Sequence, residues 1–214
     1  MKNQYQKERQ RKLTKSEQQR KEKFQVVKEE LESNGYVSHN LTIGLVYANV
    51  MAIVLGMPIA LLLTAWFFIK HPVSSILLQI DKAFLAFVLL VLLIVIHELI
   101  HGIFWGIFAK NHWKSISFGF ILQYLTPYCS CSQPLNKVEY IIGAIMPTIL
   151  LGIFPSIISI FIGSALTFII GIVMIFAGGG DLAIIFKLLR FQNRAEDILY
   201  LDHPYQAGLV AFTK

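Results

Sequence analysis

The sequence predicts a mainly α-helical membrane protein, a bundle of four transmembrane helices with a small cytoplasmic β element. The chain has 214 residues, of which 55% are apolar and only 15% are charged, whereas globular domains usually carry about 25% charged residues. Ten of the 19 Lys and Arg and six of the 13 Asp and Glu lie in the first 32 residues. The remainder contains long apolar stretches of bilayer-spanning length.

Residues 1–40 form a polar, basic segment, which we expect to be a cytoplasmic helix that ends at the Asn34-Gly35 turn. A net charge of +6 can indicate nucleic-acid binding. Here the basic residues are confined to one tail beside an apolar body, which favours the positive-inside bias of a membrane protein, so no nucleic-acid partner is expected. No cleavable signal peptide is expected either, because the chain starts with a long polar stretch.

The membrane body is expected to occupy residues 41–190. Its predicted spans are 45–69, 83–109, 140–162 and 164–186. Pro58 lies inside the first span and should kink it. The segment Gly178-Gly179-Gly180-Asp181 interrupts the last span.

Orientation follows from the basic residues near the span ends. The N-terminal tail, the 110–139 connection and the C-terminal segment 191–214 carry most of them, and only Lys70 and Lys82 fall on the other side. The chain is therefore predicted to be a multi-pass protein of the cell membrane, in contact with the lipid bilayer and with both termini in the cytoplasm.

Strand patterns appear only outside the spans. Residues 115–124 alternate apolar and polar side chains, the period-2 pattern of a strand with one buried face. Two further short strands are expected at 198–201 and 209–212, on either side of His203-Pro204. These strands predict one small cytoplasmic sheet attached to the helical body.

The sequence His97-Glu98-Leu99-Ile100-His101 lies within an apolar helix. Residues four apart share one helix face, so both imidazoles can bind one metal ion, while Glu98 can act as general base toward an attacking water. Composition alone would produce this pattern in roughly one such chain in 150. Ionisable groups deep in a membrane are costly and usually functional, although a buried polar cluster that joins helices is an alternative. The pattern is typical of a zinc hydrolase.

A catalytic zinc ion usually has three protein ligands and a water. Besides Glu98, Asp181 is the acidic residue that lies deep in an apolar stretch. At 1.5 Å per residue, His101 and Asp181 lie roughly 14 and 9 Å from the same membrane surface. The preceding glycines permit a close approach or local unwinding. Asp181 is therefore the predicted third ligand, with a helix-capping role as the alternative.

Other candidate ligands fit less well. Cys129 and Cys131 are soft donors, but one intervening residue is shorter than the usual zinc spacing, so free cytoplasmic thiols are expected. The remaining histidines are expected at surface, turn or interfacial positions; they are His39, His71, His112 and His203.

Several short motifs carry a resemblance to a known family. They are His97-Glu98-Leu99-Ile100-His101-Gly102, Tyr128-Cys129-Ser130-Cys131 followed by Pro134-Leu135, Gly143-Ala144-Ile145-Met146-Pro147, Gly180-Asp181-Leu182 and Asp202-His203-Pro204. With them, residues 85–210 resemble the bacterial family of zincin membrane peptidases. The resemblance implies an integral-membrane zinc metalloprotease related to site-2 proteases, which cut peptide bonds within or next to the bilayer.

In that wider group, an Asp ligand lies beside glycine, and Asp181 matches it in kind. The order differs, because the glycines here precede the Asp and Leu182 follows it. The resemblance thus implies Zn²⁺ held by His97, His101 and Asp181, with Glu98 as the catalytic base and a membrane-associated protein or peptide as the substrate. A substrate helix must first be extended, and the strand at 115–124 could bind it by edge pairing.

Two alternatives remain at this point. A membrane zinc protease of lipid-modified chain ends also uses His-Glu-x-x-His, but its usual third ligand is a downstream Glu, and Glu139 and Glu196 lie at or beyond the span ends. A non-catalytic membrane protein would use the same polar cluster for helix association, ion passage or partner binding.

Overall fold

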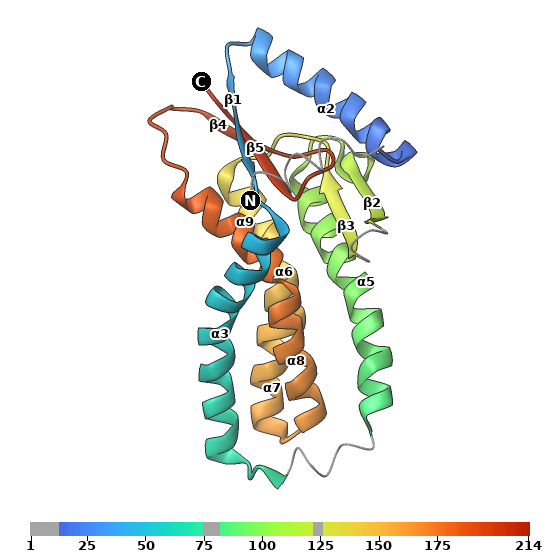
Figure 1. Ribbon diagram of the computed structural model, residues 1–214, viewed down its shortest axis with the longest axis vertical. Helices are drawn as coiled ribbons and strands as arrows, with labels where there is room; N and C mark the ends of the chain where they lie inside the picture. The colour runs from blue at the N-terminus through green and yellow to red at the C-terminus, as the bar shows by residue number, and fades with distance from the viewer. Residues whose placement is uncertain (1–12, 75–81, 122–125) are drawn as a thin grey trace.

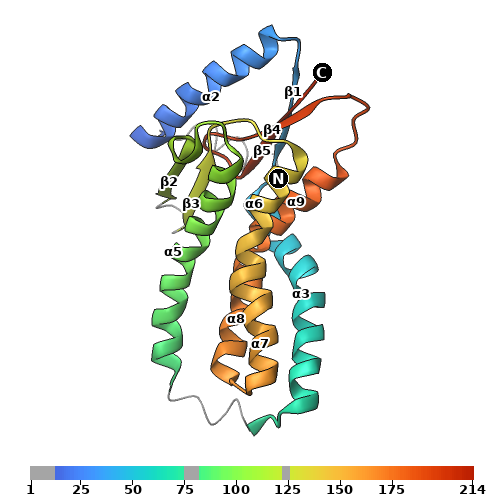
Figure 2. The same cartoon turned by 180° about the vertical axis from the view of Figure 1, so that it is seen from behind.

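The computed structural model describes residues 13–74, 82–121 and 126–214. Long apolar helices run side by side along the longest axis, and the strands and a polar helix gather at one end (Figures 1 and 2). The prediction of a mainly helical protein with a small β element is confirmed.

Within the described part of the chain, three helical stretches are long and apolar enough to cross a membrane. They are α3 (Leu45–Lys70), α5 (Ala83–Phe108) and the continuous run Lys137–Ile162. The run consists of α6 (Lys137–Pro147), the π-helical segment η3 (Thr148–Ile153) and α7 (Phe154–Ile162). Helix α3 continues through Pro58. The first three predicted spans thus match helices of the structure within a few residues.

The fourth predicted span is a bent pair of helices, α8 (Ala165–Ala177) and α9 (Gly179–Arg190), which meet at an angle of 44°. The break falls at Gly178, within the glycine segment that the sequence marks as an interruption. The predicted count of four spans therefore holds only if this pair is taken as one broken span.

The polar helix α2 (Lys15–Ser33) begins with a capping box, in which Thr14 and Glu17 satisfy each other's backbone N–H groups. It ends at Asn34, and Gly35 follows with a φ of 88°, a conformation that glycine adopts without strain. The predicted end of this helix is confirmed; residues 1–12 of the predicted segment lie outside the described residues.

Strand β1 (Val37–Thr42) follows and was not expected from the sequence. It pairs antiparallel with β5 (Gly208–Thr213), which also pairs antiparallel with β4 (Ile198–Asp202). Both predicted C-terminal strands are confirmed. The sheet order β1-β5-β4 joins the two ends of the described chain in one layer, and β5 in its centre is buried throughout.

A separate two-stranded hairpin consists of β2 (Ile116–Ile121) and β3 (Thr126–Cys131). The predicted strand at 115–124 is correct over 116–121, and its residues 122–124 lie outside the described residues. The prediction of one sheet is wrong, because this hairpin pairs separately from the β1-β5-β4 sheet. The sequence did not predict strand β3, because Pro127 and the small polar residues of this segment break the apolar alternation.

A buried cluster joins the helices to the sheet. Trp105 of α5, Tyr140 of α6, Leu188 of α9 and Tyr200 of β4 belong to it, and Tyr200 and Leu188 have at most 1% of their surface exposed. Burial of such large side chains stabilises the fold by roughly 1.5 to 3 kcal/mol each. The cluster therefore fixes one end of the helices against the strands.

Candidate metal centre

Two histidines project from one face of α5. His97 and His101 lie one helical turn apart, with their ring centroids 4.9 Å from each other. Their side chains are only 8% and 4% exposed. The shared face that the spacing predicts is therefore present, and it points into the protein.

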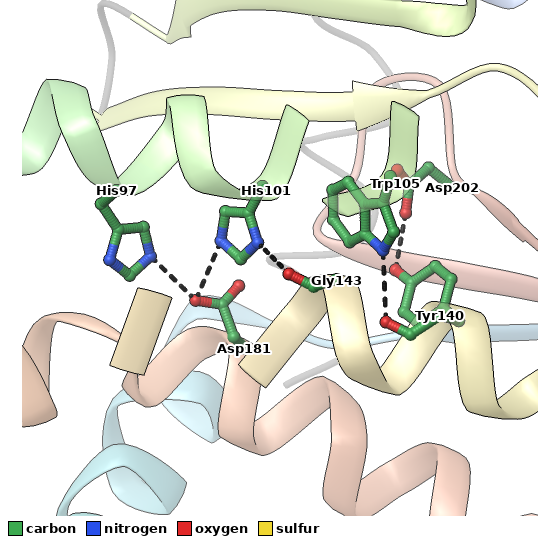
Figure 3. A network of polar contacts seen from close by, with 7 residues as sticks. All are labelled: His97, His101, Trp105, Tyr140, Gly143, Asp181 and Asp202. Atoms are coloured by element: carbon green, nitrogen blue, oxygen red, sulfur yellow. Dashed lines mark hydrogen bonds and ion pairs between the residues drawn. The ribbon is translucent and has the colours of Figure 1, made fainter. Parts of the chain in front are cut away.

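Asp181 approaches the same point from the first turn of α9. Its Oδ2 atom lies 3.1 Å from His97 Nε2 and 3.4 Å from His101 Nε2 (Figure 3). The expected alternative, a capping role, is not found, because the helix N-cap is Gly178 and the Asp181 carboxylate turns toward the histidines.

These three side chains have the donor set and spacing for one zinc ion. One ligand atom from each lies within 4.8 Å of the others. With zinc–nitrogen and zinc–oxygen bonds near 2.0 Å, neighbouring tetrahedral ligands lie about 3.3 Å apart. The two measured separations agree with that value, so His97, His101 and Asp181 could hold a single ion with little movement.

The orientation of His101 is set by its other ring nitrogen. His101 Nδ1 lies 2.8 Å from the carbonyl oxygen of Gly143 on α6 (Figure 3). Because a carbonyl only accepts, Nδ1 carries the proton, which leaves Nε2 for a metal. The Trp105 ring stacks on the imidazole at 5.0 Å. A Cβ at Gly143 would lie 2.0 Å from Trp105 Cδ1, so only glycine permits this contact.

The half-buried carboxylate of Asp202 connects three elements beside the histidines. The Tyr140 hydroxyl donates to Asp202 Oδ1 at 2.6 Å, and the Cys131 backbone N–H donates to Asp202 Oδ2 at 2.8 Å. Burial raises the pKa of Asp202, while these two hydrogen bonds act to lower it. Asp202 thus fastens β4 to α6 and β3. Asp202 belongs to the motif Asp202-His203-Pro204, for which the sequence predicted no role.

Strand β3 presents one edge to the site. Ser132 N–H donates to Ser115 O, so by alternation Ser130 and Tyr128 bond to β2, while Cys129 and Cys131 turn their backbone groups outward. The bond from Cys131 N–H to Asp202 fits this register. The outward N–H of Cys129 interacts with the carboxylate of Glu98.

Glu98 is half-buried and is not one of the three clustered ligand residues. It lines a cavity of about 270 Å³ together with both histidines and Asp181. Strand β3, helix α6 and the turn after β4 form other walls. Arg20 of α2 also borders it, with its guanidinium carbon 4.0 Å from the Tyr128 ring centroid. The cavity therefore offers room for part of an extended peptide next to the ligand atoms.

The other candidate ligands make local structural contacts. Cys129 and Cys131 are free thiols, as expected. Burial raises the pKa of both, to about 12 for Cys131, so they stay neutral. His112 is exposed and bonds to the Gly106 carbonyl at the end of α5, and His203 Nδ1 accepts from backbone N–H groups in its turn.

The two histidines at the span ends make local contacts. His39 Nε2 lies 3.0 Å from Thr213 Oγ1, between β1 and β5. His71 Nε2 lies 3.0 Å from the Ile160 carbonyl. The glutamates considered as alternative third ligands lie elsewhere, since Glu139 belongs to the capping box of α6 and Glu196 is exposed.

Residues 90–195 match the family model described as "Putative zincin peptidase". The chain belongs to this zincin peptidase family. Comparison with curated proteins and with solved structures gives no match. The family description indicates a metallopeptidase, the class of enzyme whose substrates are peptides or proteins.

The matched residues include both histidines, Glu98 and Asp181. They do not include α2 or Asp202. Arg20 and Asp202 nevertheless border the cavity in the structure, so part of its lining comes from segments outside the family match.

Proposed function

We propose that this zincin peptidase is an integral-membrane zinc metalloprotease of the site-2 type, which hydrolyses peptide bonds in membrane-embedded or membrane-proximal proteins. The observation that carries the proposal is the convergence of His97, His101 and Asp181 on one cavity. These side chains project from helices that are apolar enough to lie in a bilayer.

His97, His101 and Asp181 would hold the zinc ion. Zinc supplies Lewis-acid polarisation of a peptide carbonyl and lowers the pKa of water toward neutrality. Glu98 borders the same cavity without belonging to the ligand cluster. In the proposed reaction, its carboxylate accepts a proton from the attacking water and then delivers it to the leaving amine.

The outward edge of β3 is the proposed binding site for the extended substrate. The hypothesis drawn from the sequence placed the edge pairing on the strand at 115–124, whose described part is β2. Strand β3 lies between β2 and the cavity, and its residues from Pro127 to Ser130 line the cavity wall. Added-strand binding would use the backbone groups of Cys129, next to Glu98.

The proposed membrane arrangement has an even number of crossings, with the bent pair α8 and α9 as the fourth. Helix α2 and the C-terminus lie at the same end of the helices (Figure 1). The basic residues of the 110–139 connection and of the end of α9 also belong to this end, which favours the cytoplasm. The division into segments 1–40, 41–190 and 191–214 stays a prediction.

Zinc content and hydrolysis test the proposal. Wild-type protein purified in detergent is expected to contain one zinc per chain and to cleave a transmembrane peptide. Glu98→Gln is expected to retain zinc and lose activity by about 10² to 10⁴-fold, the usual contribution of a general base. His97→Ala is expected to lose both.

Wild-type protein without zinc would overturn the proposal and leave the non-catalytic alternative. Preferential cleavage of lipid-modified chain ends would instead support the alternative of a protease that acts on such chain ends. If wild-type protein binds zinc and cleaves the peptide, a pull-down with Glu98→Gln is expected to retain uncleaved membrane substrates.

A further inference from the structure

Two buried polar atoms next to the metal centre have no hydrogen-bond partner among the described residues. They are His97 Nδ1 and Thr148 Oγ1. His97 is 6% exposed and Thr148 is 1% exposed. A buried polar group without a partner costs roughly 1 to 3 kcal/mol, so two such atoms in one region call for an explanation.

Both side chains border Gly178, at the break between α8 and α9. A Cβ built there would lie 2.0 Å from Thr148 Oγ1 and 3.6 Å from His97 Cε1, the ring carbon bonded to Nδ1. The φ of Gly178 is −76°, which any residue adopts, so glycine is needed here for space. The absence of a side chain at Gly178 leaves the hydroxyl and the imidazole adjacent.

Thr148 occupies an unusual backbone position. It begins the π-helical segment η3, and π-helical turns occur often at functional sites. A threonine hydroxyl within a helix commonly bonds to a carbonyl of the preceding turn. Thr148 makes no such bond among the described residues, so its hydroxyl is available to a neighbour.

We infer that Thr148 is a positioning residue for His97, and this inference rests on the proposed zinc site. In the zinc-loaded protein, His97 Nδ1–H donates to Thr148 Oγ1, which fixes the ring with Nε2 toward Asp181. The Gly143 carbonyl does the same for His101. Zinc-ligating histidines almost always have such a partner on the second nitrogen.

The direction of this hydrogen bond follows from the metal bond. In the structure His97 Nε2 lies 3.1 Å from Asp181 Oδ2, so Nε2 is the nitrogen that would bind zinc. With Nε2 bound to zinc, Nδ1 carries the proton and is a donor. The Thr148 hydroxyl, which has no partner among the described residues, can accept this hydrogen bond after a small side-chain rotation.

Competition with a chromophoric zinc chelator tests this inference on the full-length protein in detergent. Thr148→Val keeps the shape and removes the hydroxyl, and its zinc dissociation constant is expected to rise about 10 to 100-fold. Thr148→Ser is expected to restore affinity to within about threefold of wild type. Thr148→Ala gives a second hydroxyl-free variant if the valine variant does not fold.

Thermal unfolding of the metal-free proteins separates positioning from general damage. Thr148→Val removes an unpaired buried hydroxyl, so the metal-free variant is expected to be at least as stable as wild type while binding zinc more weakly. Ser159→Ala is the matched control, because it removes a buried hydroxyl from α7 that already bonds to the Ser156 carbonyl. Its zinc affinity is expected to equal that of wild type.

Equal zinc affinity of wild type, Thr148→Val and Thr148→Ala would overturn the inference while leaving the zinc site intact. A loss of affinity that the serine variant does not reverse would also overturn it. If wild-type protein does not bind zinc, the inference and the proposed function are both wrong. If it binds zinc and the variants bind equally well, only the inference is wrong.

Discussion

At the scale of single residues, the candidate site depends on contacts that hold each ligand in one orientation. His101 has a carbonyl partner on Nδ1 and an indole stacked on its ring. Asp181 reaches both histidines with one oxygen. Small residues at the helix crossings make these contacts possible, and Gly143 is the clearest case.

Gly143→Ala is expected to displace Trp105 and with it His101. The new Cβ would lie 2.0 Å from Trp105 Cδ1, and such overpacking destabilises by about 1 to 3 kcal/mol. Zinc affinity should fall as well, because the carbonyl that orients His101 moves. Gly180→Ala is the control for stability, since its Cβ would meet nothing within 4 Å among the described residues. Equal stability of the two variants would contradict this account.

At the scale of elements, the turn between β4 and β5 should respond to pH. Burial, and then the charge of Arg20, lowers the pKa of His203 from 6.5 to about 4. His203 Nδ1 accepts from Gln206 N–H at 3.0 Å, which requires the neutral ring. The unfolded chain therefore binds a proton between pH 6.5 and about 4 that the folded turn excludes.

Stability is expected to fall through this window as the pH falls, by on the order of 3 kcal/mol. His203→Asn keeps an acceptor in the turn without a titrating group. The difference in unfolding free energy between wild type and this variant should therefore change between pH 7 and pH 4, measured by denaturant titration of the metal-free proteins. A constant difference would show that His203 does not titrate as stated.

Strand β3 is the element that the proposed substrate contact depends on. Cys129→Pro removes an N–H that points away from β2, so the hairpin ladder should persist. Peptide cleavage is expected to fall at least about tenfold, because one charge-assisted or edge hydrogen bond is lost. Zinc content is expected to stay unchanged.

Phe120→Pro is the matched control on the other strand. Phe120 pairs with Pro127 and has the same outward register on β2, away from the cavity. Its cleavage rate should stay near wild type. A larger effect of Phe120→Pro than of Cys129→Pro would place the substrate on the β2 edge instead.

At the scale of the whole molecule, the proposed crossing pattern puts Lys70 and Arg194 on opposite sides of the membrane. Both are exposed. In intact cells, a membrane-impermeant thiol reagent should label Lys70→Cys from outside and Arg194→Cys only after permeabilisation. The wild-type chain, with its native thiols in β3, gives the background. Labelling of both positions from one side would contradict the three crossings that the proposed arrangement places between them.

The sequence by itself determined the helical spans, the end of α2, strands β4 and β5 and the proximity of His97 to His101. Each depends on local properties, such as continuous apolar length, the Asn34-Gly35 turn or the spacing of one helical turn. Asp181 was predicted because a carboxylate is conspicuous where charge is scarce.

Only the tertiary structure decided the rest. Strand β1 forms because β5, far away in the sequence, supplies its hydrogen bonds. The roles of Gly143, Asp202 and Thr148 depend on which helix or strand packs against them, and their own neighbours in the sequence carry no signal of this. Local patterns specify what each segment can become, whereas the partners that orient a ligand are chosen by packing between distant segments.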